Sequence, residues 1–269
     1  MCLFLCSQSM NRISFLKRYI NHLVKGKSKY YLHSPFVYEL MVNVIQDKRH
    51  FYAYDEIHYL RQKLKKSKEK IKVEDYGAGS KTMNTKRKVS DIARLASISN
   101  KKGRLLFNLV NHFECKTILE LGTSIGLATS YLAKANSKAK VTTIEGCANT
   151  ASIAKSNFEL LNIKNIELIT NTFENVIPNL TNKGETFDFI YFDGNHKKEP
   201  TLNYFNQLLA TANENSIFVF DDINWSNEMW QAWQQIIKNK AVSVSIDLFF
   251  VGLIFFKKDQ AKQNFKLYF

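Results

Sequence analysis

From residue 117 onward the chain alternates short apolar runs with longer amphipathic segments, and this alternation constrains the fold more than any other feature. Helical periodicity between the apolar runs predicts helices of roughly 10 to 14 residues. Apolar strands that alternate with helices are typical of a parallel sheet covered on both faces. The predicted strands are 117–122, 140–146, 166–171, 187–193 and 216–222, and the predicted helices are 126–135, 150–162, 199–212 and 227–239.

The end of the chain follows a different pattern. Two apolar runs, "VSVSIDLFF" (242–250) and "GLIFFKK" (252–258), are separated by almost nothing. Such a short connection predicts a hairpin, in which the last strand runs antiparallel to its neighbour. Five parallel strands and this hairpin predict an α/β, Rossmann-like sheet of seven strands.

Two stretches contain glycines at the spacing of a ligand-binding turn, "VEDYGAGSK" (73–81) and "ILELGTSIGLA" (118–128). Such a turn needs a buried strand before it and a helix after it, so that backbone N–H groups at the helix start face the ligand. Only 118–128 has both flanks. For 73–81 two interpretations stay open: a plain linker, or a flap with hinges at Gly77 and Gly79 and with Asp75 facing the site.

The spacing in the second stretch is Glu120-x-Gly122-x-x-x-Gly126. A dinucleotide-binding turn has a further glycine where Ser124 stands here, and that glycine allows close approach to a pyrophosphate. The sequence therefore argues against NAD or FAD. It favours a ligand that has no phosphate at this point.

Acidic residues follow the fourth and fifth predicted strands. Asp193 ends one strand, and Asp221 and Asp222 end the other. Because the carboxyl ends of neighbouring parallel strands meet at one edge, we expect the three carboxylates to converge. Oxygen ligands of this kind suit Mg²⁺, Mn²⁺ or Ca²⁺. The alternative is that Asp221 caps the following turn and that no metal binds.

The loop after the fourth strand also contains a candidate general base, His196, because histidine is a suitable residue type for a base near neutral pH. Lys197 is the second candidate. Three tryptophans follow the fifth strand. Trp230 and Trp233, at helical spacing, are interpreted as core residues, whereas Trp225 is a candidate for stacking on a substrate.

The stretch "LELGTSIG" resembles motif I of class I S-adenosylmethionine-dependent methyltransferases. The resemblance covers roughly residues 95 to 257 and implies that S-adenosylmethionine is the cofactor. In such enzymes an acidic residue at the place of Glu145 binds the ribose hydroxyls, and the residues after the third strand surround the adenine. The implied cofactor-binding residues are Ser97, Glu120, Gly122, Thr123, Ser124, Gly126, Glu145, Gly146, Thr172, Phe173 and Asp193.

The strand ends are similar to those of cation-dependent O-methyltransferases, including the catechol enzymes. These have an Asp-Asn pair where this chain has Asp221-Asp222, so the match to their metal site is imperfect. The stretch "DGNHKKE" resembles a DGxHxxE branch of the same enzymes. The resemblance implies methyl transfer to a hydroxyl oxygen of a small molecule or glycan, with His196 and Asp193 in the catalytic site.

The front of the chain is strongly basic. Residues 1–104 contain 23 Lys and Arg against 8 Asp and Glu, whereas the whole chain has a net charge of +14. An acidic partner is one interpretation, whether a substrate, nucleic acid or anionic membrane, and a solvated lysine-rich surface is the other. We expect residues 1–94 to be a basic helical extension and linker, and residues 95–269 to be the cofactor-binding domain.

A helix is predicted at residues 11–25, and its apolar side chains share one face: Ile13, Leu16, Tyr19, Ile20, Leu23 and Val24. It could lie on an anionic membrane. A helix docked on its own domain is the interpretation that we favour.

Other functions stay open beside the O-methyltransferase. A nucleic-acid methyltransferase would use the basic front, but "DGNH" stands where amino-methylating enzymes often have an (Asn/Asp)-Pro-Pro-(Tyr/Phe) stretch. A membrane-surface or scaffold protein could retain the fold without catalysis. The oligomeric state cannot be derived from the sequence.

The four cysteines form no CxxC pair, which argues against zinc and favours reduced thiols in the cytoplasm. No apolar run reaches the roughly 18 residues that span a bilayer. The opening "MCLFLCSQSM" lacks the features of a signal peptide, and translation could start at Met1 or Met10.

Overall fold

The computed structural model describes residues 12–74 and 85–269. These residues form two compact units, one made of 48–176 and the other of 12–47 together with 177–269. Their main sheet is mixed and has eight strands in the order β10-β8-β9-β7-β6-β3-β4-β5. The boundary predicted between residues 94 and 95 stays a prediction.

The first unit contains a parallel three-stranded arrangement, in which β3 pairs with β4 and β4 with β5. Its helices α6 and α7 pack on β4, and α3 and α5 pack on α6. The elements are α3 (Tyr52–Lys65), β1 (Lys70–Val73), β2 (Thr85–Lys88), α4 (Val89–Asp91), η3 (Ile92–Ala96), α5 (Asn100–His112), β3 (Thr117–Leu121), α6 (Leu127–Ala135), β4 (Lys140–Glu145), α7 (Ala148–Leu160) and β5 (Ile166–Thr170). Helix α8 (Phe173–Asn182) begins in this unit and ends in the other.

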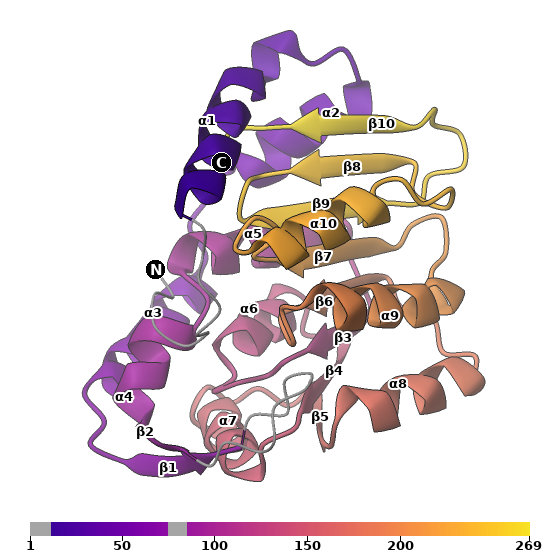
Figure 1. The fold of residues 1–269 in the computed structure, drawn as a ribbon. Coiled ribbons are helices and arrows are strands. Elements are labelled where there is room, and N and C mark those ends of the chain that lie inside the picture. The colour runs from indigo at the N-terminus through magenta and orange to yellow at the C-terminus, as the bar shows by residue number, and fades with distance from the viewer. Residues whose placement is uncertain (1–11, 75–84) are drawn as a thin grey trace. The chain divides into compact units, whose positions relative to one another are not determined.

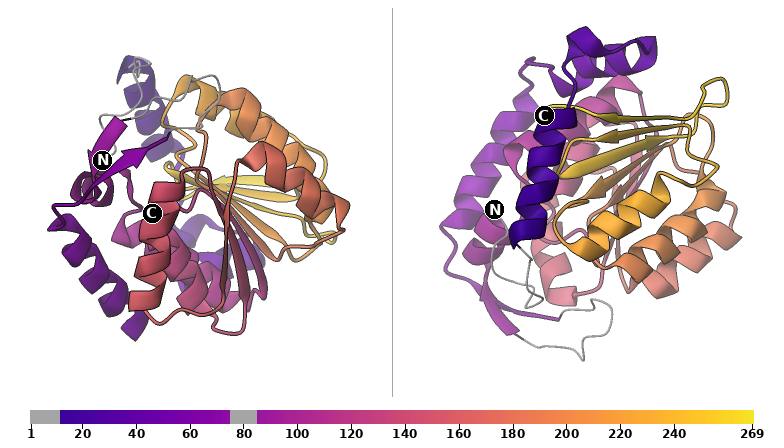
Figure 2. Two further views of the ribbon diagram at one scale, coloured as in Figure 1. Left: turned by 90° about the horizontal axis from the view of Figure 1, so that it is seen from below. Right: turned by 45° about the horizontal axis from the view of Figure 1, so that its top comes forward.

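The second unit contains the remaining strands. β6 and β7 are parallel, β9 is antiparallel to both β7 and β8, and β10 is parallel to β8. Helices α9 and α10 lie side by side, as the right-hand view of Figure 2 shows. The elements are α1 (Arg12–Lys25), η1 (Lys29–Tyr31), α2 (Pro35–Leu40), η2 (Met41–Ile45), β6 (Phe189–Phe192), α9 (Lys198–Leu208), η4 (Leu209–Thr211), β7 (Ile217–Asp221), α10 (Asn227–Ile236), β8 (Val244–Asp247), β9 (Val251–Phe255) and β10 (Gln263–Lys266).

The five predicted parallel strands are all present, each within two residues of its expected bounds. Strands β6 and β7 are fully buried, and this explains why they could be predicted from apolar runs. Every residue in them is apolar except Asp221 at the end of β7. β8 and β9 pair antiparallel across a turn at 248–250. The predicted number of seven strands is wrong, because β10 adds an eighth at the edge beside β8.

The front of the chain also differs from the prediction. Helix α3 ends at Lys65, and the basic residues that follow it enter a small antiparallel sheet of β1 and β2. Ile71 is the buried side chain of β1, and lysines occupy the positions on either side of it. The end of this strand reaches the start of α7, where Asn149 Nδ2 donates to the Lys72 carbonyl over 2.8 Å. The predicted hinge glycines Gly77 and Gly79, like Asp75, lie outside the described residues.

Helix α1 is anchored in the second unit at the carboxyl ends of β8 and β10 (Figure 1). His22 is buried, with Nδ1 3.4 Å from Asp247 Oδ1 and Nε2 3.2 Å from the Leu267 carbonyl oxygen. Burial by itself would raise the pKa of Asp247, but the hydrogen bond from His22, the charge of Lys266 and the backbone N–H of Phe249 hold this pKa below its usual value. The carboxylate is therefore ionised and fixes the helix to the sheet.

Candidate functional site

The loop between β3 and α6 forms a tight turn in the first unit. Gly122 and Gly126 have φ angles of 106° and 79°, in the left-handed region that favours glycine. The backbone N–H groups of Gly122 and Thr123 both donate to the Ile144 carbonyl, over 3.0 and 3.2 Å. These bonds fix the turn to the neighbouring strand, so the loop is preformed at the carboxyl end of β3.

Gly126 also serves packing between helices. A Cβ atom at this position would lie 2.5 Å from the ring of Phe158 in α7. From the same helix, Asn157 Nδ2 donates to the Ile125 carbonyl over 2.8 Å. The second glycine of the motif is therefore explained by close approach to α7 as well as by its φ angle.

Glu145, at the end of β4, is bound to this loop. Its Oε2 accepts the backbone N–H of Ser124 over 2.8 Å, and its Oε1 accepts that of Cys147 over 3.0 Å. Ser124 itself has a φ of 49°, a conformation that L-residues rarely adopt. These two hydrogen bonds orient the half-buried carboxylate of Glu145 towards the turn.

Glu120 lies beneath the loop and is 0% exposed. Its Oε2 accepts hydrogen bonds from the hydroxyls of Thr129 and Thr143, over 2.5 and 2.6 Å. Its Oε1 has no hydrogen-bond partner among the described residues. Burial raises the pKa of Glu120 to about 7, although both threonine hydroxyls act to lower it. Because Glu120 is fully buried, its predicted role in cofactor binding would be indirect, through support of the loop between β3 and α6.

This buried carboxyl makes the stability of the protein depend on pH. Because the folded-state pKa of Glu120 is about 7 and its ordinary value is 4.5, the folded state binds the proton more tightly than the unfolded state. We expect the free energy of unfolding to fall by about 3 kcal/mol from this group as the pH rises from 4.5 through 7. In Glu120→Gln this contribution is absent. Urea unfolding at pH 5 and pH 8 measures the difference.

The control for this prediction is Glu167→Gln on β5, whose carboxylate is half exposed and lies 2.7 Å from Lys140 Nζ. It should keep the pH dependence of the unchanged protein. If Glu120→Gln and the unchanged protein lose equal stability between the two pH values, Glu120 does not titrate in this range.

The other predicted cofactor residues, apart from Asp193, are distributed over the first unit. Thr123 is buried, and its hydroxyl lies 2.6 Å from that of Thr143, so it points inward. Ser97 follows η3 and donates to the Ile92 carbonyl over 3.0 Å. Half-buried residues at the ends of β4 and β5 complete the set: Gly146, Thr172 and Phe173. Their contact with a cofactor stays a prediction.

In the second unit, Asp193 and His196 lie in the loop between β6 and α9. His196 Nε2 is 3.7 Å from Asp193 Oδ1, and their side chains are 33% and 22% exposed. Between them, Asn195 has a φ of 53° and its side-chain amide donates to Tyr204 Oη over 3.1 Å. The loop between β6 and α9 is therefore fixed by this hydrogen bond and contains one residue with a strained φ angle. It places the accessible imidazole of His196 beside the carboxylate of Asp193. Lys197 occupies the N-cap position of α9, without a side-chain capping hydrogen bond.

The loop after β7 is held by groups that sequence reasoning did not find. Asn224 Nδ2 donates to the Phe249 carbonyl over 2.8 Å, and the N–H of Ile223 donates to the Phe250 carbonyl over 3.3 Å. Arg18 of α1 donates to the Asn224 carbonyl over 3.2 Å. No signal in the sequence linked position 18 to position 224, because the contact joins segments 206 residues apart.

Asp221 is buried and Asp222 is half-buried with a φ of 53°. Among residues 12–74 and 85–269, no group of three His, Cys, Asp or Glu side chains is placed to hold a metal ion. The residues as arranged do not fit the predicted site at Asp193, Asp221 and Asp222, so no step of the chemistry is derived through a metal.

The tryptophans after β7 differ in their surroundings. Trp233 is buried against Gly252, where a Cβ atom would lie 2.6 Å from its ring. Trp230 is exposed, so its assignment to the core is wrong. Trp225 is half-buried, and its N–H donates to the Asp222 carbonyl over 2.9 Å. The backbone of Trp225, the candidate for stacking on a substrate, is thus fixed next to the end of β7.

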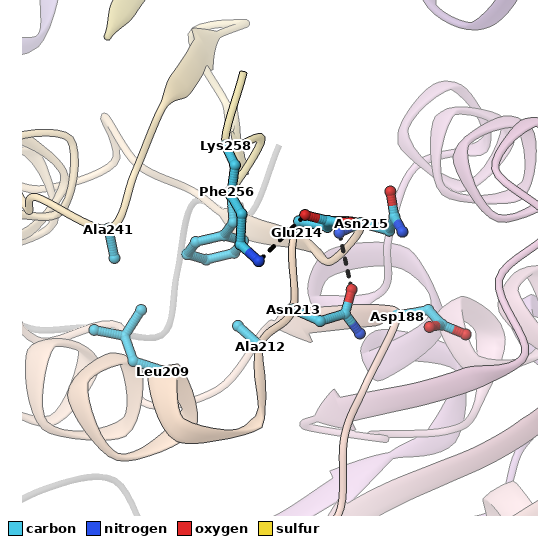
Figure 3. A pocket seen from close by; sticks show the side chains of 9 residues that line it. All are labelled: Asp188, Leu209, Ala212, Asn213, Glu214, Asn215, Ala241, Phe256 and Lys258. Atoms are coloured by element: carbon cyan, nitrogen blue, oxygen red, sulfur yellow. Dashed lines mark hydrogen bonds and ion pairs between the residues drawn. The ribbon is translucent and has the colours of Figure 1, made fainter. Parts of the chain in front are cut away.

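A cavity of about 680 Å³ in the second unit lies away from all of these residues. It is lined from the amino ends of β6 and β7, where Asp188 and Asn215 lie, and from the chain after β9 (Figure 3). Lys258 Nζ is 3.4 Å from Glu214 Oε2 at its rim. No predicted site residue lines this cavity.

Comparison with known proteins identifies the fold. Residues 119–223 match the profile of a family described as a methyltransferase domain. This segment of the chain is therefore similar to methyltransferase domains. The resemblance stated from "LELGTSIG" is therefore confirmed.

Two curated proteins that are similar to this chain are named catechol O-methyltransferases. The protein from Niastella koreensis is 28% identical over 130 residues, which are 47% of this chain and 58% of the relative. The protein from Mycobacterium tuberculosis is 26% identical over 138 residues, or 50% of this chain and 61% of the relative. The chain thus spans less than two thirds of the length of the curated relatives that it matches.

Solved structures share the fold at low identity. An O-methyltransferase from Bacillus cereus in complex with SAH has a TM-score of 0.54 and 21% identity, covering 77% of this chain and 92% of its own. An SAH-bound methyltransferase from Podospora anserina has a TM-score of 0.57 and 13% identity, covering 95% and 100%.

Proposed function

We propose that this protein transfers a methyl group from S-adenosylmethionine to a hydroxyl oxygen of a small molecule or glycan. The observation that carries the proposal is the fixed Glu145 carboxylate, which is hydrogen-bonded to the backbone of the glycine turn. A carboxylate oriented at a strand end beside such a turn suits the two hydroxyls of a ribose. The names of the curated relatives support a hydroxyl acceptor.

The acceptor is assigned to the loops after β6 and β7 in the second unit. His196 removes the proton from the hydroxyl, and the oxygen attacks the methyl carbon as the bond from that carbon to sulfur breaks. S-adenosylhomocysteine leaves, and the proton stays on His196 Nε2 or Nδ1. Asp193, 3.7 Å away, stabilises the imidazolium that forms. Lys197 is the alternative base, and alignment of the two reactants supplies much of the rate.

Three finer points belong to this proposal. We place the reaction in the cytoplasm, since Cys115 and Cys147 are buried free thiols. The described residues include no helix long and apolar enough to cross a membrane. We leave nucleic acid out as an acceptor, because net charge is the only feature that favours it.

Calorimetry with S-adenosylhomocysteine tests the cofactor part, and transfer of a labelled methyl group to catechol tests the acceptor part. We expect saturable binding of one ligand per chain. A chain that binds no S-adenosylhomocysteine would contradict the whole proposal. Repeating the titration with Mg²⁺ tests the metal prediction, because a site at Asp193, Asp221 and Asp222 requires Mg²⁺ binding that is lost in Asp222→Ala.

A further inference from the structure

Helix α1 docks on the second unit by a face that largely differs from its predicted apolar face. The ring centroid of Phe15 lies 5.3 Å from that of Phe249, and His22 is buried beside Asp247. Arg18 reaches the loop after β7. Residues 15, 18 and 22 follow one another at three and four positions, so they define one side of the helix. This docked side is only partly apolar.

The opposite side of α1 exposes a continuous apolar row. Its five members are between 44% and 77% exposed, and they are spaced so that they share one face. We call this row the outer stripe: Ile13, Leu16, Ile20, Leu23 and Val24. The expectation that the helix docks on its own domain is confirmed, and Tyr19 of the predicted apolar face packs on Phe249 with ring centroids 5.0 Å apart. The outer stripe, by contrast, is exposed.

Basic side chains surround the outer stripe. Arg12 and Lys17 flank it on its two sides, given the helical period of 3.6 residues. Further cations follow at Lys25, Lys27 and Lys29, whereas the first acidic residue of the chain is Glu39. The surface around the stripe therefore combines exposed aliphatic side chains with positive charge of a single sign.

We propose that the outer stripe binds the surface of a bilayer rich in anionic phospholipids. A helix with an apolar side and flanking Lys and Arg lies in the plane of such an interface, with its apolar side chains among the acyl chains and its cations at the lipid phosphates. This goes beyond methyl transfer and does not depend on it. The helix lies on the bilayer and does not span it, as its 14 residues are too few.

The charge and the apolar character of this surface favour an anionic bilayer over two other partners, a second copy of the chain and nucleic acid. A second copy of the chain would bring the same cations face to face, and like charges across an interface oppose association. Nucleic acid would pair with the cations, but it would leave the five aliphatic side chains without an apolar partner. An anionic bilayer provides an apolar environment for the outer stripe and phosphate groups for the cations beside it.

The helix can bind a membrane without leaving the protein. Tyr268 Oη donates to the Leu23 carbonyl over 2.7 Å, and Lys27 N–H donates to the Lys266 carbonyl over 2.8 Å. With the buried His22 these contacts secure the C-terminal half of α1. The stripe is therefore presented on a helix that is already folded, which lowers the entropic cost of binding.

Co-sedimentation with vesicles tests the proposal. We expect the protein to bind vesicles of phosphatidylcholine with 30% phosphatidylglycerol at least about tenfold more strongly than vesicles of phosphatidylcholine alone, and less strongly as salt rises. The double variant Leu16→Glu/Ile20→Glu should lose about tenfold or more in affinity for the anionic vesicles. Both replaced side chains are exposed, so the fold and the affinity for S-adenosylhomocysteine should be unchanged.

The matched control is Leu160→Glu, which changes an exposed leucine at the end of α7 and should bind vesicles as the unchanged protein does. Equal vesicle binding by the stripe variant and the unchanged protein would overturn the proposal. So would failure of the unchanged protein to bind anionic vesicles. A dimer in sedimentation equilibrium that the stripe variant abolishes would assign the stripe to a second copy and also overturn it.

Discussion

Glu145→Ala is expected to weaken the binding of S-adenosylhomocysteine about 100-fold. A hydrogen bond to a charged acceptor contributes about 1.5 to 3 kcal/mol, and two ribose hydroxyls would donate to this carboxylate. A total loss of about 3 kcal/mol corresponds to a factor of about 100 in the dissociation constant. The change also removes the acceptor of the Ser124 and Cys147 N–H groups, so the glycine turn loses its anchor. Isothermal titration calorimetry measures the affinity.

Two further variants separate the hydrogen bonds from a general effect of charge. Glu145→Gln keeps one acceptor oxygen and should retain part of the affinity. Glu167→Ala removes a half-exposed carboxylate from the neighbouring strand β5 and should leave the affinity unchanged. Unchanged binding by Glu145→Ala would show that the ribose is held elsewhere.

His196→Ala is expected to lower kcat for methyl transfer to a hydroxyl by a factor of about 10² to 10⁴. The imidazole is accessible, lies beside Asp193 and is the group that we assign to take the hydroxyl proton. Binding of S-adenosylhomocysteine should be unchanged, because His196 is not one of the predicted cofactor-binding residues. The pH profile of kcat should also lose the limb that reports the base. Steady-state rates with labelled S-adenosylmethionine provide both measurements.

Lys197→Ala distinguishes the two candidate bases. If Lys197 is the base, its variant shows the large loss in kcat and His196→Ala retains its rate, which contradicts the assignment made here. Glu199→Gln is a control within the first turn of α9. Its carboxylate is largely exposed, so its rate should be close to that of the unchanged protein.

Sequence reasoning predicted the parallel strands and the glycine turn because local patterns encode them. A buried strand such as β6 (Phe189–Phe192) is apolar throughout, and its neighbours in the chain are helices with a clear polar face. The acidic residue at the end of β4 was also predictable, since strand length fixes its position. Asp193 and His196 follow from the same reasoning at the end of β6.

Elements that depend on distant partners were missed. No helix was predicted where α8 lies, and this helix contains Pro178, a residue that removes a backbone hydrogen bond inside a helix. Strand β10 is a polar edge strand that exists because it pairs with β8. β1 and β2 are lysine-rich and pair with each other, and the buried side chain of Ile71 is the only apolar signal within β1 besides Val73.

The sequence by itself determined the α/β class, the order of the parallel strands along the chain, the turn at Gly122 to Gly126 and the acidic residues at the strand ends. These follow from periodicity and from backbone rules that act over a few residues. The tertiary structure decided that Glu120 is buried with a raised pKa, that Arg18 supports the loop after β7, and that α1 docks by one side and exposes the other. Each of these depends on contacts between residues far apart in the chain, whose burial and charge no local pattern records.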